Sequence, residues 1–340
     1  MLYKDVVSGG KPMYLLTNHQ PSKLEAATFA EFGMKESDME EILRKNVDIV
    51  CDDEESMLII GQQVRNAKNG RSDLTAIDNH GDIVLIEIKR DKKDITGRRE
   101  AFEFQAIRYA ASCATIKSTD ALIQDLFAPY VEKHKCEFAQ VAELTSTEIA
   151  KRELNNFIEA NEICDFNAHQ RVILVASEFD EQTLSAVAWL NSNQVDISCY
   201  ELRPYKLGDH ILLDAQKLLP LVEYDDYYVQ VAPKEPIQKG RKTDISRRSL
   251  PKIDSMLEWG VVKAGDIIVA KGTEEEAVLQ ANGQVQTAAG IQSMQQWLKN
   301  IYGWSSVETY AFAIQKDSGK TLMEIRKAYL DQRDRNDEPV

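Results

Sequence analysis

The chain has 340 residues, 43% of them hydrophobic, and a formal net charge of −14 at pH 7. This length accommodates two domains with ordinary hydrophobic cores. No stretch approaches the roughly 20 apolar residues of a membrane helix, and the N-terminus lacks a signal-peptide pattern. The acidic excess argues against non-specific coating of nucleic acid. A local nucleic-acid groove is still compatible with it, because clustered cations act within about 8–10 Å.

Five cysteines are scattered along the chain without a Cys-x-x-Cys pair. Their odd number and irregular spacing favour reduced thiols over a disulfide or zinc framework. We therefore expect buried, reduced cysteines in a cytoplasmic protein. They are Cys51, Cys113, Cys136, Cys164 and Cys199.

The first predicted elements are a short strand at 13–16 and an amphipathic helix at 32–45. The helix carries several glutamates, and one in its first turn has an ordinary explanation, because acidic side chains stabilise helix N-termini. The alternative is that one of them points towards a metal site, and position alone leaves the choice open. These glutamates are Glu36, Glu40 and Glu41.

A buried hairpin is predicted over residues 72–90. A three-residue loop centred on His80 ends in a glycine, which supplies the left-handed conformation that such a loop needs. Folding about His80 pairs residues whose numbers sum to 160, so Asp73 falls opposite Glu87 with Cβ atoms about 5 Å apart. Both faces of both strands are largely apolar, which predicts a sheet covered on both sides.

Two carboxylates are therefore expected close together inside an apolar element, with Lys89 on the same strand face as Glu87. At an effective dielectric constant near 20, such a pair repels by roughly 3 kcal/mol before any desolvation. One explanation is a structural ion pair in which Lys89 neutralises one acid. A divalent metal bridging Asp73 and Glu87, with Lys89 beside a reacting phosphate, accounts for all three residues together.

A strand at 56–64 precedes the hairpin, and a helix at 99–114 follows it. On this helix Gln105 and Tyr109 are one turn apart on the same face. By itself such a pair is typical of a solvated helix face. The pair becomes informative through its place in the chain, because the predicted elements follow the order helix, three strands, helix.

Together these residues resemble the PD-(D/E)xK nucleases, which share the restriction endonuclease fold. The match is Asp73, then thirteen residues, then Glu87-Ile88-Lys89, with a downstream QxxxY element like that of the RecB-like branch. Arg71-Ser72 stands where the family has a proline before the aspartate. The resemblance implies an α/β fold with a mixed sheet flanked by helices over residues 1–224, including a helical insertion at 119–160.

The resemblance also implies the chemistry of the site. Mg²⁺, for which Mn²⁺ would substitute, is expected to bind two carboxylates and a backbone carbonyl, while a lysine orients or deprotonates the attacking water. Gln105 and Tyr109 are expected to position their helix and contact the DNA backbone. The implied catalytic and metal-binding residues are Asp73, Glu87, Lys89 and Glu36, which we favour among the helix glutamates, with the carbonyl of Ile88 as a further ligand.

Two further segments follow the hairpin region. Strands at 171–177 and 195–202 with a helix at 183–191 predict a parallel crossover that extends the sheet. Residues 225–250 predict an interdomain linker, and the stretch 234–252 has seven basic and two acidic residues. A solvated linker and a linker that contacts DNA phosphates remain equally plausible interpretations. The contacting side chains would be Arg241, Lys242, Arg247 and Arg248.

Residues 251–331 predict a small α+β domain, followed by a tail at 332–340. Its expected elements are helices at 253–260, 293–303 and the C-terminus, and strands at 266–270, 277–280 and 310–315. The domain resembles the RAMA module, the restriction enzyme adenine methylase associated domain. That likeness rests on the residues 257–265, 277–283, Gly303-Trp304 and 319–326. It implies recognition of DNA, including modified DNA, while Trp297 and Trp304 are expected to be core aromatics.

The combined expectation is a Mg²⁺-dependent endodeoxyribonuclease acting in restriction or defence against foreign or modified DNA. A DNA-repair nuclease is the nearest alternative. A catalytically inactive nuclease-fold protein that binds DNA or serves as a scaffold, and an RNA nuclease, are further alternatives. A homodimer is plausible because cutting both strands usually takes two active sites, and no membrane partner is expected.

Overall fold

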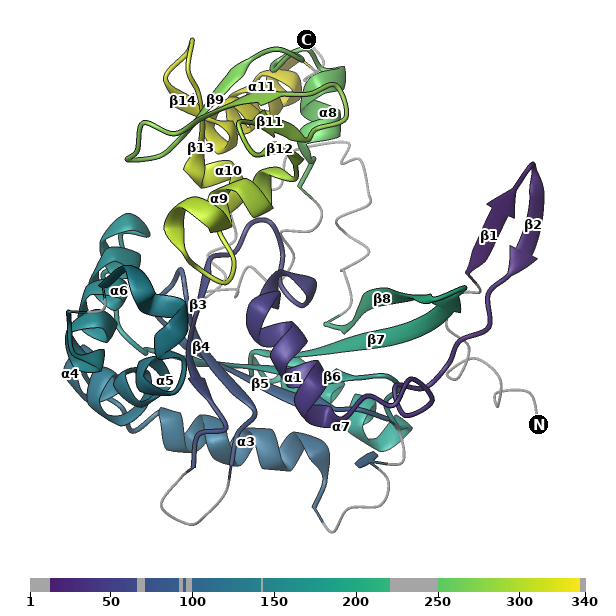
Figure 1. Cartoon of the computed structure of the whole chain (residues 1–340), viewed down its shortest axis with the longest axis vertical. Helices are drawn as coiled ribbons and strands as arrows, with labels where there is room; N and C mark the ends of the chain where they lie inside the picture. Colours follow the sequence, from purple (N-terminus) through teal and green to yellow (C-terminus); the bar gives the residue numbers. More distant parts are fainter. Residues whose placement is uncertain are drawn as a thin grey trace. The chain divides into compact units, whose positions relative to one another are not determined.

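In the structure, a computed structural model, the chain forms two compact units (Figure 1). The first unit comprises residues 1–45 and 59–221, and the second comprises residues 46–58 and 222–340. The chain therefore contributes a short early segment to the second unit before it completes the first. The structure describes residues 13–65, 71–91, 94–95, 100–141, 143–220 and 250–336.

The first unit is built on a six-stranded mixed sheet, which confirms the predicted α/β class. In sheet order the strands are β3 (Met57–Gln62), β4 (Leu74–Asp78), β5 (Ile83–Lys89), β6 (Gln170–Ala176), β7 (Ile197–Leu207) and β8 (His210–Leu219). β4 and β5 are antiparallel, β5, β6 and β7 run parallel, and β8 returns antiparallel to β7. The parallel β6–β7 pair confirms the predicted crossover, whose helix is α7 (Glu181–Ser192).

The β4–β5 hairpin has the register predicted from its loop. Leu74 pairs with Ile86, so paired residue numbers sum to 160. Every residue of both strands is buried, as expected for strands covered on both faces. Gly81 closes the loop at a φ of +83°, and a side chain there would collide with the backbone oxygen of Asp165. A glycine is thus required both by the backbone conformation and by the close approach of another segment.

The helices of the first unit are α1, α3 and α7, together with a group between α3 and β6 that matches the predicted helical insertion (Figure 1). Side chains of α3 and α7 form one hydrophobic cluster with alternate residues of β6, among them Leu174 and Ala176. Leu174 pairs with Glu87 and Ala176 with Lys89, so these two polar residues face the α3 side of the sheet. The helices are α1 (Glu36–Lys45), α3 (Phe102–Cys113), α4 (Thr119–Leu122), a π-helix (Ile123–Phe127), α5 (Ala128–Lys133), a 3₁₀ segment (Lys135–Val141) and α6 (Ser146–Ala160).

An antiparallel hairpin of β1 (Tyr14–Thr17) and β2 (Gln20–Lys23) precedes α1. Only its first strand is predicted from the sequence. β8 is also absent from the prediction. None of its residues is fully buried, so the strand lacks the uninterrupted apolar run that identified β6.

The described residues of the second unit form a six-stranded antiparallel sheet and several helices, as expected for an α+β domain. In sheet order its strands are β12 (Gly290–Gln292), β11 (Val285–Thr287), β10 (Glu276–Leu279), β9 (Ile267–Ala270), β13 (Ala313–Gln315) and β14 (Lys320–Thr321). Its helices are α8 (Ile253–Glu258), α9 (Met294–Tyr302), α10 (Thr309–Phe312) and α11 (Leu322–Asn336). Trp297 and Trp304 are buried in its core, as expected.

The predicted strand at 310–315 is partly wrong, because its first half is helix α10 and only residues 313–315 form β13. In the structure, the amides of Ala311 and Phe312 instead donate to the carbonyl of Glu308 and close a short helical turn. This turn shortens the predicted strand to its last three residues.

The segment 46–58 is held in the second unit by polar contacts. It includes a short 3₁₀ helix, Val47–Ile49. The Met57 amide donates to the carbonyl of Ser306, and the Met57 carbonyl accepts from the amides of Ser305 and Ser306. Glu54 and Arg326 form a buried ion pair with contacts of 2.6 and 2.8 Å. The second unit is therefore assembled from two distant parts of the sequence.

Two side expectations can be checked on the described residues. All five cysteines are free, but Cys136 and Cys164 are exposed, so the expectation that all five are buried is wrong. Cys136 lies in the 3₁₀ segment Lys135–Val141, and Cys164 lies in the connection between α6 and β6. No helix among the described residues is long and apolar enough to cross a membrane.

Candidate active site

The β4–β5 hairpin brings the predicted site residues together where the two strands meet the neighbouring helices. Asp73 immediately precedes β4, and Glu87 and Lys89 belong to the end of β5. Asp73 is 6% exposed, Glu87 is fully buried and Lys89 is 1% exposed. The confirmed register, continued by one pair, places Asp73 opposite Glu87. The sequence therefore placed these charged groups inside the protein correctly.

The ammonium group of Lys89 is the hub of the site. Its Nζ donates to the carbonyl of Ile88 at 2.5 Å and lies 3.4 Å from Glu36 Oε1 and 3.7 Å from Asp73 Oδ2. It also lies 5.2 Å from the centre of the Phe102 ring, which attracts a cation. These contacts gather oxygens from α1, from the start of β4 and from the end of β5 around one positive charge.

The carboxylate of Asp73 is oriented by the backbone. Its Oδ2 accepts a hydrogen bond from the amide of Ile88 at 2.8 Å. Its own carbonyl accepts from the amide of Gln63 at 2.7 Å, which fixes the chain just before β4 against the end of β3. A carboxylate held by backbone donors keeps its position without relying on a flexible side chain.

The predicted Gln/Tyr pair reaches this region from α3. Gln105 Nε2 donates to Glu87 Oε2 at 3.3 Å, and the Tyr109 hydroxyl accepts from the backbone amide of Arg71 at 2.7 Å. Gln105 therefore positions the carboxylate of Glu87. Tyr109 fixes the segment that leads into Asp73. The predicted contact of both residues with DNA remains a prediction.

The three glutamates of α1 are distinguished by their surroundings. Glu36, about one-third exposed, contacts Lys89. Glu40 is buried, and its Oε2 accepts a hydrogen bond from Gln63 at 3.0 Å. Burial and the nearby charge of Asp73 raise the pKa of Glu40, although hydrogen bonds with Gln63 and Gln62 oppose this shift. Glu41 bonds instead to Arg44, which lowers the pKa of Glu41 to about 2.

Glu36 and Glu40 are thus both directed towards the site, whereas Glu41 is not. All three glutamates were candidates from the sequence, and the family resemblance favoured Glu36 over Glu40. The spacing in the sequence does relate Glu40 to Glu36, because residues four apart lie on the same face of a helix. If Glu36 points to the site, Glu40 is expected to follow it one turn later.

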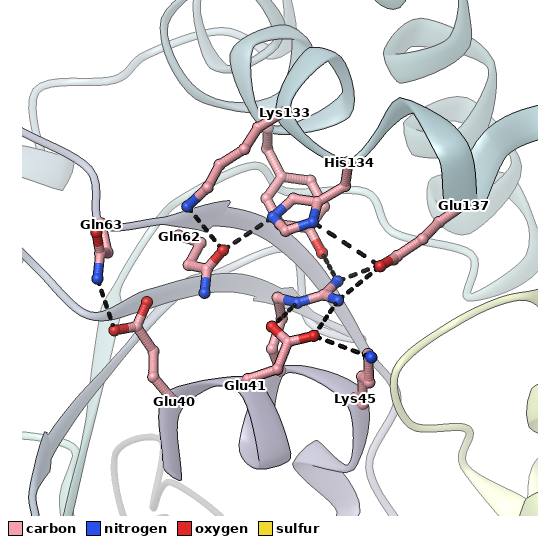
Figure 2. A network of polar contacts seen from close by, with 10 residues as sticks. Glu40, Glu41, Lys45, Gln62, Gln63, Lys133, His134 and Glu137 are labelled. Carbon is pink, nitrogen blue, oxygen red and sulfur yellow. Dashed lines mark hydrogen bonds and ion pairs between the residues drawn. The ribbon is translucent and has the colours of Figure 1, made fainter. Parts of the chain in front are cut away.

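Figure 2 shows the polar network that fixes α1 against the helical insertion. Arg44 is buried, and its guanidinium binds Glu41 and Glu137 at 2.7–2.9 Å and also donates to Tyr130. Beside it, the Oε1 atom of Gln62 accepts from Lys133. This network connects the insertion to the end of β3, next to the residue that holds Glu40.

His134 completes the network, with its Nε2 2.8 Å from Gln62 Oε1. The Gln62 oxygen is an acceptor, so His134 carries a proton on Nε2. Burial and then the positive charge of Arg44 lower the pKa of His134, and Glu137 only partly opposes them. The ring is therefore a neutral donor at pH 7.

The oxygens gathered at Lys89 agree chemically with a hard cation such as Mg²⁺, which prefers carboxylate, carbonyl and water ligands. Within the part of the chain that the structure describes, no group of three or more His, Cys, Asp or Glu side chains is spaced to hold a metal. The cation that contacts Glu36, Asp73 and the Ile88 carbonyl is instead the ammonium of Lys89. The donor atoms fit the expected ion, and Lys89 contacts the atoms that the ion would use.

The predicted DNA-contacting side chains of the linker lie outside the described residues. They are Arg241, Lys242, Arg247 and Arg248.

We found no match between this chain and any protein-family model or curated protein. The case for a function therefore rests on the residues of the site and their geometry.

Proposed function

We propose that the protein is a Mg²⁺-dependent deoxyribonuclease related to the PD-(D/E)xK nucleases. The observation that carries this proposal is the convergence of Glu36, Asp73 and the Ile88 carbonyl on the buried ammonium of Lys89. The expected residue types come from three separate elements and meet at one place. Chance matches to a short motif in the sequence would not produce this convergence.

The long contacts of Lys89 support a divalent cation over a purely structural ion pair. Four carboxylates occupy this region, those of Glu36, Glu40, Asp73 and Glu87, and the ammonium in contact with two of them is that of Lys89. Its distances to the two carboxylates, 3.4 and 3.7 Å, are longer than those of close charge-assisted hydrogen bonds. A hard divalent cation would bind carboxylate and carbonyl oxygens at much shorter distances than these.

In the proposed reaction, Asp73, Glu87 and the Ile88 carbonyl would hold the ion, with Glu36 as a further ligand. The bound ion would activate water and offset charge on the phosphate. Gln105 keeps Glu87 in place, and the backbone amide of Ile88 does the same for Asp73. Lys89, when released from the Ile88 carbonyl, can donate to the reacting phosphate or orient the attacking water.

DNA as substrate, a role in restriction or defence, and recognition of DNA by a RAMA-like second unit are parts of the same proposal. A homodimer would place two sites on the two strands of a duplex. One observation favours an alternative function, that of an inactive DNA-binding protein of the same fold. That observation is the lack, among the described residues, of a metal-spaced cluster of acidic, histidine or cysteine side chains.

The deciding experiment is cleavage of single-stranded, duplex and modified DNA, and of matched RNA, in the presence of Mg²⁺ or Mn²⁺. Asp73→Ala and Lys89→Ala should each reduce the rate by at least about 100-fold, because each removes a group expected to stabilise the transition state. Asp209→Ala and Lys206→Ala alter exposed residues at the β7–β8 turn and should leave the rate unchanged.

Three outcomes separate the alternatives. Full activity of Asp73→Ala and Lys89→Ala would refute the site. Absence of cleavage of every substrate with either metal would favour the inactive DNA-binding alternative. Preference for RNA over the matched DNA would replace the substrate class while preserving the chemistry.

A further inference from the structure

Two exposed arginines face each other beside the candidate active site. Arg65 follows β3, Arg71 precedes β4, and the two residues form an antiparallel β-bridge. Backbone hydrogen bonds continue this pairing towards the site, from Ser72 to Val64 at 3.0 Å and from Gln63 to Asp73 at 2.7 Å. The arginines are thus attached to the backbone that positions Asp73.

Direct opposition of two like charges across a strand pair is unfavourable. Among the residues that the structure describes, neither guanidinium has an ion-pair partner. Side chains directly opposite on paired strands have Cβ atoms about 5 Å apart, so one anion can contact both guanidinium groups. A pair of opposed arginines is therefore better suited to a bound anion than to the free protein.

The position of the pair indicates which anion it would take. A single residue separates Arg71 from Asp73, so their Cα atoms are at most about 7 Å apart. The hydroxyl of Tyr109 accepts the amide hydrogen of Arg71, and the same helix supplies Gln105 to Glu87. Helix α3 therefore fixes the arginine segment and the acidic site relative to each other.

We propose that Arg65 and Arg71 form a clamp for a backbone phosphate of the nucleic-acid strand, next to the phosphate that is cleaved. Guanidinium groups bind phosphate oxygens through paired hydrogen bonds and are always charged. Tyr109 acts as a positioning residue for Arg71. This inference rests on the proposed nuclease function, because that function supplies the strand whose neighbouring phosphate the clamp holds.

The test is the salt dependence of binding to a fluorescein-labelled DNA duplex, measured by anisotropy with Ca²⁺ at a fixed concentration. Each arginine that contacts a phosphate contributes about one unit to the slope of log affinity against log salt concentration. Arg65→Gln and Arg71→Gln should each lower that slope by about one. Arg152→Gln is the matched control, because Arg152 is exposed on α6 and pairs with Glu153. It should leave the slope unchanged.

A second readout separates a binding role from a structural one. Without DNA, Arg65→Gln and Arg71→Gln should melt at the same temperature as the parent protein or higher, because each relieves like-charge opposition. A lower melting temperature together with an unchanged salt slope would show that the arginines are structural, and would overturn the clamp.

The source of the phosphate is tested by competition at constant ionic strength. Inorganic phosphate should displace the labelled duplex no better than chloride. If it displaces the duplex from the parent protein but not from the double variant, the clamp is a free-phosphate site and the nucleic-acid assignment is wrong. DNA binding with unchanged slopes in both variants would refute the clamp while leaving the nuclease proposal intact. Clamp-dependent binding without cleavage would support the clamp and refute the nuclease.

Discussion

At the scale of single residues, the most informative positions are charged groups inside the β4–β5 hairpin. The sequence located Asp73, Glu87 and Lys89 correctly because the register is a local property. It follows from the length of one loop and from the alternation of strand faces. The contact of Lys89 with Glu36 is not local, since 53 positions separate the two residues. A helix pattern alone could rank the glutamates of α1 only by analogy.

Asp78 is a further buried acid of the same hairpin, and it gives a pH-dependent prediction. Its Oδ1 accepts from the amides of His80 and Asp82, yet burial raises its pKa to about 6. The folded protein therefore binds this proton more tightly than the unfolded chain, whose aspartate pKa is near 3.8. Stability from this group is complete below about pH 4 and is lost as pH rises through about 6.

Asp78→Asn removes the charge while keeping an oxygen that can accept both amides. Relative to the parent protein, the variant should gain stability between pH 4 and pH 7, on the order of 2–3 kcal/mol. Unfolding by denaturant at the two pH values measures this difference. Asp209→Asn, at the exposed β7–β8 turn, should show no such gain. An equal effect of Asp78→Asn at both pH values would contradict a raised pKa.

At the scale of elements, the amphipathic pattern of α1 was sufficient to predict a helix, but not what holds it. Arg44 bonds to Glu137, which lies 93 positions later in the chain. An arginine in the last turn of a helix has an ordinary local explanation, since cations stabilise helix C-termini. The network in Figure 2 shows instead a buried guanidinium that joins α1 to the helical insertion. Contacts of this kind depend on the assembled fold.

Arg44→Met tests the role of this connection. The variant keeps apolar bulk but removes the guanidinium from Glu137 and from Glu41, which still pairs with Lys45. Both carboxylates are about 40% exposed and can be rehydrated. We therefore expect a loss of about 1–3 kcal/mol, below the 3–5 kcal/mol typical when a fully buried pair is broken. Lys45→Met, with a lysine side chain that is 59% exposed, should cost less than about 1 kcal/mol.

The same variant gives a second readout at His134. Removing Arg44 takes away a positive charge that lowers the pKa of His134, while Glu137, which raises it, remains. The pKa of His134 should therefore increase, which NMR titration of the ring can detect. An unchanged pKa would mean that Arg44 does not act on His134 through charge.

At the scale of the whole molecule, the unexpected feature is the division of the second unit between two parts of the sequence. Residues 46–58 directly follow α1 and lead into β3, so sequence continuity assigns them to the first unit. Their partners lie some 250 positions later, as in the contacts of Ser56 with Glu308 and of Glu54 with Arg326. No local pattern in the sequence carries information about such pairings. In the C-terminal part of this unit, the sequence predicts α8, β9, β10, α9 and α11, whereas β11, β12 and β14 were not predicted.

The Glu54–Arg326 pair provides the test at this scale. Both side chains are at most 4% exposed, and the Arg326 guanidinium also lies 4.3 Å from the Tyr310 ring centre. Arg326→Met should therefore cost about 3–5 kcal/mol, because it removes the guanidinium from a buried ion pair. Glu54→Gln, which retains a polar partner for Arg326, should cost less.

A double-mutant cycle isolates the pair from the separate effects of each change. With Glu54→Met added to Arg326→Met, the buried charge disappears together with its partner, so the double variant should be more stable than Arg326→Met alone. Denaturant unfolding followed by the fluorescence of Trp297 and Trp304, which are buried in this unit, measures all four proteins. Strict additivity of the two single changes would show that segment 46–58 is not held in the second unit by this ion pair.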